Sequence, residues 1–352
     1  MTVGNLLIGG GAPVSVQTMS KCDTWDVKAV LGQAEALRKA GCELLRVAVP
    51  DEKSANALAE IKRECPLPLC ADIHFDHRLA LTALDAGVDK LRINPGNIGD
   101  VEKLKVVVKE AKGRKVPIRI GVNAGSLEKK LLEKHGKATP QAMVESALGH
   151  IQILEDLQFE DIVVSLKAND VRTTVEAYRL MAEKKPYPLH VGVTEAGSPN
   201  AGTVKSAMGI GMLLMEGLGD TIRVSLTAEP REEVRVGWEI LKSAGIRKRG
   251  PTVVSCPTCG RIGFDMIPRV AEIEKRIQHL TCPFTIAVMG CEVNGPGEAK
   301  DADIGIAGGG DRAALYKKGK FLRVVSFDRF VDEVVAEAEK LEGELDGSMV
   351  TS

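Results

Sequence analysis

The chain has 352 residues, of which 44% are hydrophobic and 3% aromatic, and its formal net charge is -1 at pH 7. The scarcity of aromatic side chains excludes a stacking platform for single-stranded nucleic acid, and the balanced charge excludes a basic surface for nucleic acid or an anionic membrane. The length is typical of two domains with substantial cores.

From residue 14 to about residue 230, short strands rich in β-branched residues alternate with amphipathic helices. Strands are predicted at 14–17, 44–49, 69–73, 90–93, 117–122, 161–166, 189–193 and 221–226. Helices are predicted at 26–40, 54–64, 78–86, 101–111, 139–157, 173–184, 204–214 and 231–244. Eight alternations predict an α/β fold, a TIM-like (β/α)8 barrel. A doubly wound sheet is disfavoured because no G-x-G-x-x-G motif follows an early strand.

A charged stretch bounded by Gly and Pro, from Gly245 to Pro251, predicts the domain boundary. We therefore expect a barrel over 1–246 and a small α+β domain over 247–352. In the second domain, strands are predicted at 252–255, 285–289 and 304–307, and a helix at 266–280. A hairpin around Lys318-Gly319-Lys320 and a final helix from Phe330 complete it.

The N-terminal segment lacks the basic start and apolar core of a signal peptide, and no apolar run approaches the ~20 residues of a membrane span. The eight cysteines are scattered along the chain and do not predict a secreted disulfide framework. We expect a cytoplasmic protein whose thiols are core residues, metal ligands or nucleophiles.

Basic residues interrupt five of the predicted barrel strands. Leu-Arg-Val or a close variant occurs around Arg46, Arg92, Arg119 and Arg223, and Lys167 ends another strand. An unpaired buried cation is costly, so each must meet a carboxylate or a bound anion. Active sites of such barrels lie at the carboxyl ends of the strands, and the guanidinium fork suits phosphate oxygens. The pattern predicts a multiply anionic small ligand, most simply a diphosphate.

Polar residues follow the same strands, at the end where a ligand would bind. They are Asp72, His74, Asn94, Asn123, Thr194, Glu195 and Ser225. Glu195 directly follows an apolar strand, where a general acid or base would face the ligand. Its alternative role is that of an ion-pair partner for one of the arginines.

Three cysteines near the C-terminus have the spacing of a metal or cluster site: Cys256 and Cys259 in a C-x-x-C turn, and Cys291 beside a loop rich in Gly and Pro. Glu298 follows seven residues after Cys291. Three thiolates and this carboxylate suit a cubane cluster, with one iron whose oxygen ligand is displaceable. Structural zinc with Cys282 as the fourth ligand remains the alternative.

Taken together, these motifs resemble the 4-hydroxy-3-methylbut-2-enyl diphosphate synthase family, in its bacterial two-domain form. The matching stretches span nearly the whole chain and include Ala71-Asp72-Ile73-His74-Phe75, Val193-Thr194-Glu195-Ala196-Gly197 and the segments 255–261 and 289–298. The resemblance implies reductive ring opening and dehydroxylation of 2-C-methyl-D-erythritol 2,4-cyclodiphosphate to (E)-4-hydroxy-3-methylbut-2-enyl diphosphate. This is a step of isoprenoid biosynthesis by the methylerythritol phosphate pathway.

The resemblance also implies a [4Fe-4S] cluster on Cys256, Cys259, Cys291 and Glu298, with electrons supplied by flavodoxin or ferredoxin. It implies a homodimer and a catalytic role for Glu195. The residues that it implies for substrate binding are Arg46, Asp72, His74, Arg92, Asn94, Arg119, Asn123, Lys167, Thr194, Arg223, Ser225 and Asn294.

Two departures from the family pattern are visible. The chain starts almost directly at Val3-Gly4, and Gln17-Thr18-Met19-Ser20-Lys21 replaces the more usual Gln-Ser-Met-Thr-Asn at the end of the first strand. Two other classes of protein remain open on the residues alone: a cluster-free barrel transferase of the pterin-binding kind, and a zinc-ribbon binding module.

Overall fold

The computed structural model describes residues 1–94, 101–259, 262, 264–290, 295–309 and 312–350. The chain divides into two compact units, Met1–Arg247 and Lys248–Ser352. Each unit has a sheet and a hydrophobic core of its own. Over the described residues, no helix combines the length and the apolar character that crossing a bilayer demands.

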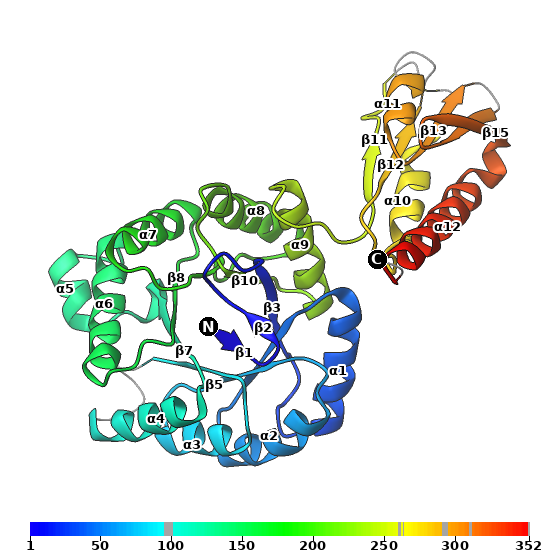
Figure 1. Ribbon diagram of the computed structural model, residues 1–352. Coiled ribbons are helices and arrows are strands. Elements are labelled where there is room, and N and C mark those ends of the chain that lie inside the picture. Colours follow the sequence, from blue (N-terminus) through cyan, green and yellow to red (C-terminus); the bar gives the residue numbers. More distant parts are fainter. Residues whose placement is uncertain (95–100, 260–261, 263, 291–294, 310–311, 351–352) are drawn as a thin grey trace. The chain divides into compact units, whose positions relative to one another are not determined.

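The first unit is the predicted barrel (Figure 1). Its eight parallel strands run in the order β8-β7-β6-β5-β4-β3-β10-β9, and a parallel bridge between Val164 and Leu189 joins the two ends. The strands are β3 (Ser15–Met19), β4 (Leu44–Ala48), β5 (Leu69–Asp72), β6 (Lys90–Ile93), β7 (Ile118–Asn123), β8 (Ile162–Lys167), β9 (His190–Val191) and β10 (Thr221–Ile222). The last two strands are shorter than predicted.

Helices surround the barrel, and side chains fix where several of them begin. Asp26, Asp51, Asp76, Thr139 and Asp170 each accept a hydrogen bond from a backbone N–H of the first turn. The helices are α1 (Val27–Ala40), α2 (Glu52–Glu64), α3 (His77–Asp85), α4 (Val101–Arg114), α5 (Lys129–His135), α6 (Pro140–Asp156), α7 (Val171–Lys184), α8 (Pro199–Met215) and α9 (Pro230–Ser243). The short helix α5 was not predicted from the sequence.

A two-stranded hairpin precedes the barrel and was also not predicted. It consists of β1 (Thr2–Val3) and β2 (Leu6–Leu7), which pair antiparallel. Val3 and Ile8 pack with Leu44, Cys70 and Val163, which lie at or near the start of three barrel strands. The hairpin therefore covers the amino end of the barrel, and the carboxyl end is left for a ligand.

The second unit is a five-stranded mixed sheet in the order β11-β12-β13-β14-β15. The strands are β11 (Thr252–Ser255), β12 (Thr285–Met289), β13 (Ile304–Gly309), β14 (Arg312–Lys317) and β15 (Lys320–Ser326). Its helices are α10 (Ile267–Arg276), α11 (Gly295–Asp301) and α12 (Phe330–Val350). Helix α10 is shorter than predicted, and α11 was read as part of a loop.

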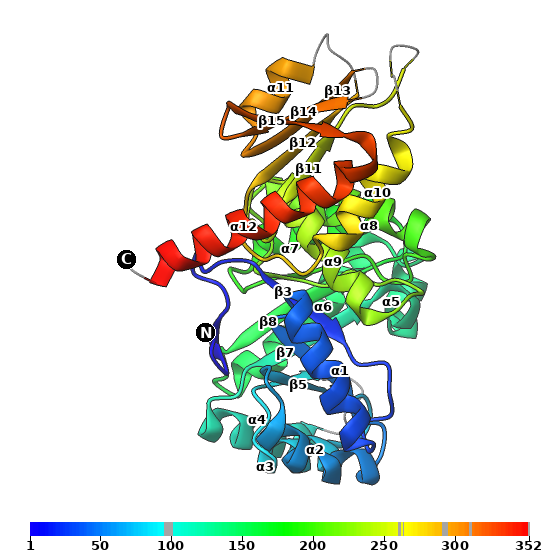
Figure 2. The ribbon, with the colours of Figure 1, turned by 90° about the vertical axis from the view of Figure 1, so that its right-hand side faces the viewer.

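Helices α10 and α12 lie on one face of this sheet and α11 lies on the other (Figure 2). Alternating residues of β12 contribute to two core layers, one on each face. Ile286 and Val288 pack with α10 and α12, whereas Ala287 and Met289 pack with Ala302, just after α11. Helices therefore cover both faces of the sheet. Helix α11 comes so close to β13 that a Cβ on Gly305 would lie within 1.9 Å of the Ala299 carbonyl oxygen, so only glycine fits there.

Candidate active site

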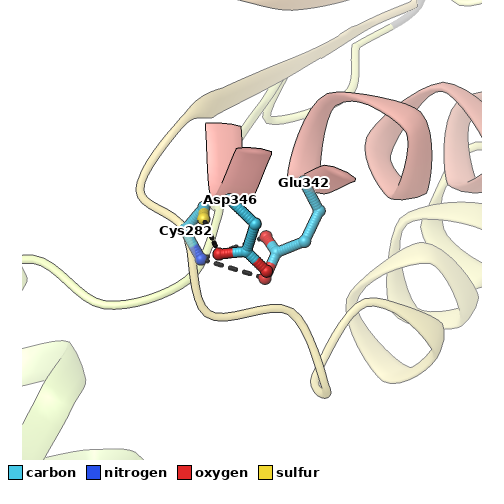
Figure 3. A group of neighbouring side chains, drawn as sticks. All are labelled: Cys282, Glu342 and Asp346. Carbon is cyan, nitrogen blue, oxygen red and sulfur yellow. Dashed lines mark hydrogen bonds between the residues drawn. The ribbon is translucent and has the colours of Figure 1, made fainter. Parts of the chain in front are cut away.

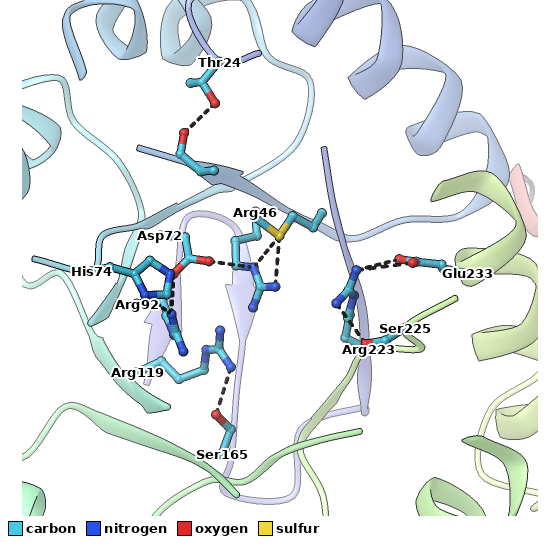
Figure 4. Close-up of polar contacts among 12 residues, drawn as sticks. Thr24, Arg46, Asp72, His74, Arg92, Arg119, Ser165, Arg223, Ser225 and Glu233 are labelled. Atoms are coloured by element: carbon cyan, nitrogen blue, oxygen red, sulfur yellow. Dashed lines mark hydrogen bonds and ion pairs between the residues drawn. The ribbon is translucent and has the colours of Figure 1, made fainter. Parts of the chain in front are cut away.

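The basic residues of the strands converge inside the barrel (Figure 4). Side chains alternate along a strand, and the strand register places Arg92 beside both Asp72 and Arg119. Arg119 is 1% exposed, Lys167 6%, Arg92 7% and Arg46 9%. Four cations are therefore largely withdrawn from water at one end of the barrel.

Asp72 is the carboxylate that Arg46 and Arg92 share. Arg92 Nη1 donates to its Oδ1 at 2.9 Å, and Arg46 Nε lies 3.5 Å from Oδ2. His74 Nε2 lies 3.3 Å from Oδ1 and 2.7 Å from Arg92 Nη1. Burial alone would raise the pKa of Asp72, but Arg46, the bond to His74 and Arg92 together hold it far below its usual range. Asp72 is therefore ionised, and it orients two arginines.

The cations outnumber the carboxylates that meet them. Arg119 Nη1 donates to Ser165 Oγ at 2.9 Å, but its Nε and Nη2 have no hydrogen-bond partner among the described residues, and the same holds for Nε of Arg92 and of Arg223. Burial, with the nearby charges of Arg46 and Arg92, lowers the pKa of Arg119 to about 9. Burial and neighbouring arginines also lower the pKa of Lys167 well below its usual value. An anion with several oxygens would relieve this repulsion and accept the unused N–H groups.

Two inward-facing glycines make room for these long side chains. A Cβ on Gly121 would lie 2.7 Å from Arg92 Nε, and one on Gly192 would lie 3.0 Å from Lys167 Nζ. Neither backbone needs the left-handed region. At Gly121 the neighbouring cation excludes a larger residue, whereas at Gly192 the backbone carbonyl oxygen of Arg223 lies even closer than Lys167 to an added Cβ and is the main obstacle. The sequence analysis missed both, although each stands two residues along the chain from a predicted site residue.

The predicted polar residues lie at the ends of the same strands. Asn94, Asn123, Thr194 and Ser225 are half-buried. Ser225 Oγ accepts from Arg223 Nη1 at 2.8 Å, and the Thr194 N–H donates to the Ala168 carbonyl at 3.1 Å, which ties the β9 end to β8. The sequence therefore placed these residues correctly at the carboxyl end of the barrel.

Glu195 has a left-handed backbone, with φ of 51°. This conformation costs about 1–2 kcal/mol for a residue with a Cβ. The side chain is exposed, immediately after Thr194. Strain of this kind concentrates at functional sites. Among the described residues, Glu195 forms no ion pair with any of the barrel arginines.

Glu233 is a site residue that the sequence analysis missed. It is 1% exposed, and its carboxylate receives Arg223 Nη2 at 3.2 Å on each oxygen. A signal was present, because Glu233 occupies a core-facing position of α9 between Pro230 and Gly237, where an acidic residue needs a partner.

In the second unit, Cys256 and Cys259 follow β11 at its carboxyl end. The Cys256 N–H donates to the Val288 carbonyl at 3.0 Å, which fixes the turn against β12, and Thr258 has a left-handed φ of 64°. Cys256 is half-buried, and Cys259 and Glu298 are exposed. Cys291 and Asn294 lie outside the described residues. The described part of the site thus offers thiols and a carboxylate that solvent or a cofactor can reach.

Cys282 belongs to a different group, with Glu342 and Asp346 (Figure 3). Glu342 accepts hydrogen bonds from the backbone N–H groups of Thr281 and Cys282, and the Cys282 thiol donates to Asp346 Oδ1 at 3.3 Å. The acidic groups and burial raise the pKa of this thiol to about 11, with burial as the larger cause. The group anchors α12 to the chain before β12.

Cys282 lies at the amino end of β12, whereas Cys256 follows the carboxyl end of the parallel strand β11. A five-residue strand rises about 3.3 Å per residue, so the two thiols are too far apart to bind one zinc ion. This excludes the zinc site with Cys282 as fourth ligand. Among the described residues, Cys256, Cys259 and Glu298 form no group whose ligand atoms all lie within 4.8 Å, but the ligands of a cubane stand farther apart than those of a single ion.

Comparisons with known proteins identify relatives of both units. Residues 1–238 match the family model described as "GcpE TIM-barrel domain", and residues 252–340 match "GcpE protein C-terminal domain". A protein of Geobacter sulfurreducens named 4-hydroxy-3-methylbut-2-en-1-yl diphosphate synthase (flavodoxin) is 56% identical over 339 residues, which is 96% of either chain. A protein of Symbiobacterium thermophilum with the same name is 54% identical and covers 98% of this chain and 94% of its own.

A solved structure with a similar barrel is the dihydropteroate synthase of Yersinia pestis in complex with a sulfonamide drug. It is 11% identical, with a TM-score of 0.49, over 70% of this chain and 99% of its own.

Proposed function

The chain belongs to the 4-hydroxy-3-methylbut-2-en-1-yl diphosphate synthase family, and we propose that its barrel holds the cyclic diphosphate substrate while its second unit holds the redox cofactor. The matches to both family models and to the curated relatives confirm the family resemblance seen in the sequence. The enzyme is an oxidoreductase of isoprenoid biosynthesis that reductively opens 2-C-methyl-D-erythritol 2,4-cyclodiphosphate to (E)-4-hydroxy-3-methylbut-2-enyl diphosphate. The pterin-type transferase and the zinc-ribbon module are not favoured.

The surplus of buried cations carries the assignment of the substrate site. A cyclic diphosphate offers several anionic oxygens, and the unused N–H groups of Arg92, Arg119 and Arg223 are the donors that such oxygens accept. Lys167 adds a point charge. Arg46 and the polar residues at the strand ends complete the set of barrel residues. These polar residues are Asp72, His74, Asn94, Asn123, Thr194 and Ser225.

Replacing Arg119 by Met tests this site. The change removes the cation and keeps a side chain that fills the barrel. We expect the dissociation constant for inorganic pyrophosphate, measured by calorimetry on the full chain, to rise at least tenfold, because a buried charged contact is lost. An unchanged dissociation constant with a folded variant would remove Arg119 from the site.

Glu195 is the proposed acid or base of the reaction. Glu195 lies four residues after β9, beyond the carboxyl end of that strand, and its left-handed backbone fixes where the side chain starts. Its role is to deliver the proton that accompanies loss of the substrate hydroxyl as water. The arginines hold the diphosphate meanwhile, so that the reacting carbon stays in place.

We propose that the cofactor is a [4Fe-4S] cluster held by Cys256, Cys259, Cys291 and Glu298. The donor set of three thiols and one displaceable carboxylate supports this assignment. The accessibility of Cys256 and Cys259, which follow β11, supports it as well. When bound, such a cluster supplies electrons one at a time and an iron that acts as a Lewis acid. Iron, acid-labile sulfide and zinc analysis after anaerobic purification tests this. Zinc without iron would contradict it.

Three further assignments follow from family membership. The relatives' name includes flavodoxin, and we propose flavodoxin as electron donor, with ferredoxin as the alternative to be compared in the same assay. We propose a homodimer, which light scattering on the purified protein tests. Cluster thiolates persist in a reducing compartment, so we place the protein in the cytoplasm.

A further inference from the structure

Both carboxylate oxygens of Glu233 accept hydrogen bonds. Besides Arg223, it accepts from Thr18 Oγ1 at 2.7 Å and from the Leu226 N–H at 3.0 Å. Its side chain has no exposed surface. These partners come from β3 and from the segment after β10, and Glu233 itself belongs to α9, so one side chain joins three segments that meet at the carboxyl end of the barrel.

Lys21 reaches the same carboxylate from the loop after β3. Its Nζ lies 3.3 Å from Glu233 Oε1, donates to the Leu226 carbonyl at 3.1 Å and also donates to the Ala228 carbonyl. The side chain is 36% exposed, so the ammonium covers the buried carboxylate from the solvent side. It connects the first strand of the barrel to the loop between β10 and α9.

We propose that Lys21 and Glu233 form a clasp that positions Arg223 for the diphosphate. The proposal rests on the proposed function, in which Arg223 contacts the substrate. Within the clasp, Glu233 holds Arg223 Nη2, Ser225 holds Nη1, and Nε remains without a partner among the described residues. Glu233 and Lys21 are positioning residues and do not touch the reacting atoms.

The charges explain why a second cation is needed. Glu233 orients Arg223, but its own negative charge would oppose a nearby diphosphate and reduce the net charge that Arg223 presents. Lys21 compensates Glu233, so that Arg223 keeps its full charge for the substrate. Without Lys21, the pair of Arg223 and Glu233 is neutral.

The test uses two readouts on the full chain: the dissociation constant for inorganic pyrophosphate, and KM and kcat for the cyclic diphosphate. We expect Glu233→Gln to raise the dissociation constant and KM about tenfold with kcat within a factor of two, because the contact lies away from the bond that breaks. The amide of glutamine has the same shape as the carboxylate, but its NH2 group would face N–H groups of Arg223 or Leu226 that now donate to Glu233. We expect Lys21→Met to raise KM about threefold and Lys21→Arg to restore it.

The coupling between the two residues separates positioning from a general loss of structure. Adding Lys21→Met to Glu233→Gln should have no further effect on KM, because Lys21 acts through Glu233. The matched control is Lys28→Met on the exposed surface of α1, which should leave both constants unchanged. Should Glu233→Gln fail to fold, Glu233→Asp and the Lys21 variants provide the same comparison. The proposal would be overturned if the effects of Lys21→Met and Glu233→Gln on KM added in the double variant. It would also be overturned if these variants lowered kcat and left KM unchanged.

A reference variant distinguishes this inference from the proposed function. Arg223→Met should weaken pyrophosphate binding by itself. If it does so while the Glu233 and Lys21 variants bind as the unaltered protein does, the clasp is wrong and the substrate site stands. If Arg223→Met binds pyrophosphate normally, the substrate assignment of Arg223 fails, and with it the basis of the clasp.

Discussion

Replacing Gly121 by Ala should damage substrate binding by displacing a neighbouring side chain. The added Cβ would lie 2.7 Å from Arg92 Nε and 2.9 Å from Nη2. Nonbonded contacts settle at about 3.5 Å, so the guanidinium must retreat by about 0.8 Å (3.5 minus 2.7). Arg92 is 7% exposed, so little open space is available for that movement.

The retreat costs binding because Arg92 is held in place by short bonds. Its Nη1 donates to Asp72 at 2.9 Å, and β6 lies between β5, which carries Asp72, and β7, which carries Gly121. A retreat from Gly121 therefore pushes the guanidinium toward the β5 side and disturbs this bond. Overpacking of this kind costs about 1–3 kcal/mol. Returning Arg92 to its original position for the substrate would cost about this much, which corresponds to a rise in KM of about 5- to 160-fold.

Steady-state kinetics with the cyclic diphosphate and calorimetry with pyrophosphate measure the effect. The matched control is Gly113→Ala in α4, where an added Cβ meets nothing within 4 Å. That variant should bind normally and gain up to about 1 kcal/mol in helix stability. If Gly121→Ala bound pyrophosphate as tightly as the control does, the close packing of Arg92 against β7 would not matter for the site.

Three further predictions concern other parts of the chain. Glu195→Gln should lower kcat by about 10²- to 10⁴-fold at saturating substrate and reductant with little change in KM, and full turnover would refute its role as acid or base. Cys259→Ser should abolish the visible absorption of the cluster, whereas Cys282→Ser should keep it; the reverse would exchange their roles. Burial lowers the pKa of Lys90 from 10.5 to about 7, so the unfolded chain binds more protons and stability rises with pH between these values. The Lys90→Met variant should therefore have a higher free energy of unfolding in denaturant than the unaltered protein. This difference should be largest at pH 7 and should shrink toward pH 10. A difference that does not change with pH would contradict the buried charge.

The barrel was predictable from the sequence because its signal is local and repeated. Eight apolar β-branched segments alternate with amphipathic helices, and β6 begins and ends at the predicted residues, Lys90 and Ile93. The hairpin β1-β2 was missed because its strands have two residues each, too few for a period to appear. Helix α11 was missed because its Gly and Pro residues are typical of a loop.

The candidate site was predictable to the extent that its residues interrupt apolar strands. Arg119 is conspicuous because a cation inside a buried strand needs an explanation. Gly121 is not, since its requirement arises from the side chain of Arg92 on the neighbouring strand. Glu233 is separated from Thr18 by most of the barrel sequence, and only the closed barrel brings them together. Contacts across the fold depend on tertiary structure, which single-sequence patterns do not contain.

The most direct test of the account is turnover by the anaerobically purified chain. With reduced flavodoxin and 2-C-methyl-D-erythritol 2,4-cyclodiphosphate, it should form (E)-4-hydroxy-3-methylbut-2-enyl diphosphate, detected by phosphorus NMR as the conversion of a cyclic to a linear diphosphate. The Arg119→Met variant in the same assay should need much more substrate for the same rate. Recovery of intact cyclic substrate, from protein that contains its full complement of iron and sulfide, would contradict the account.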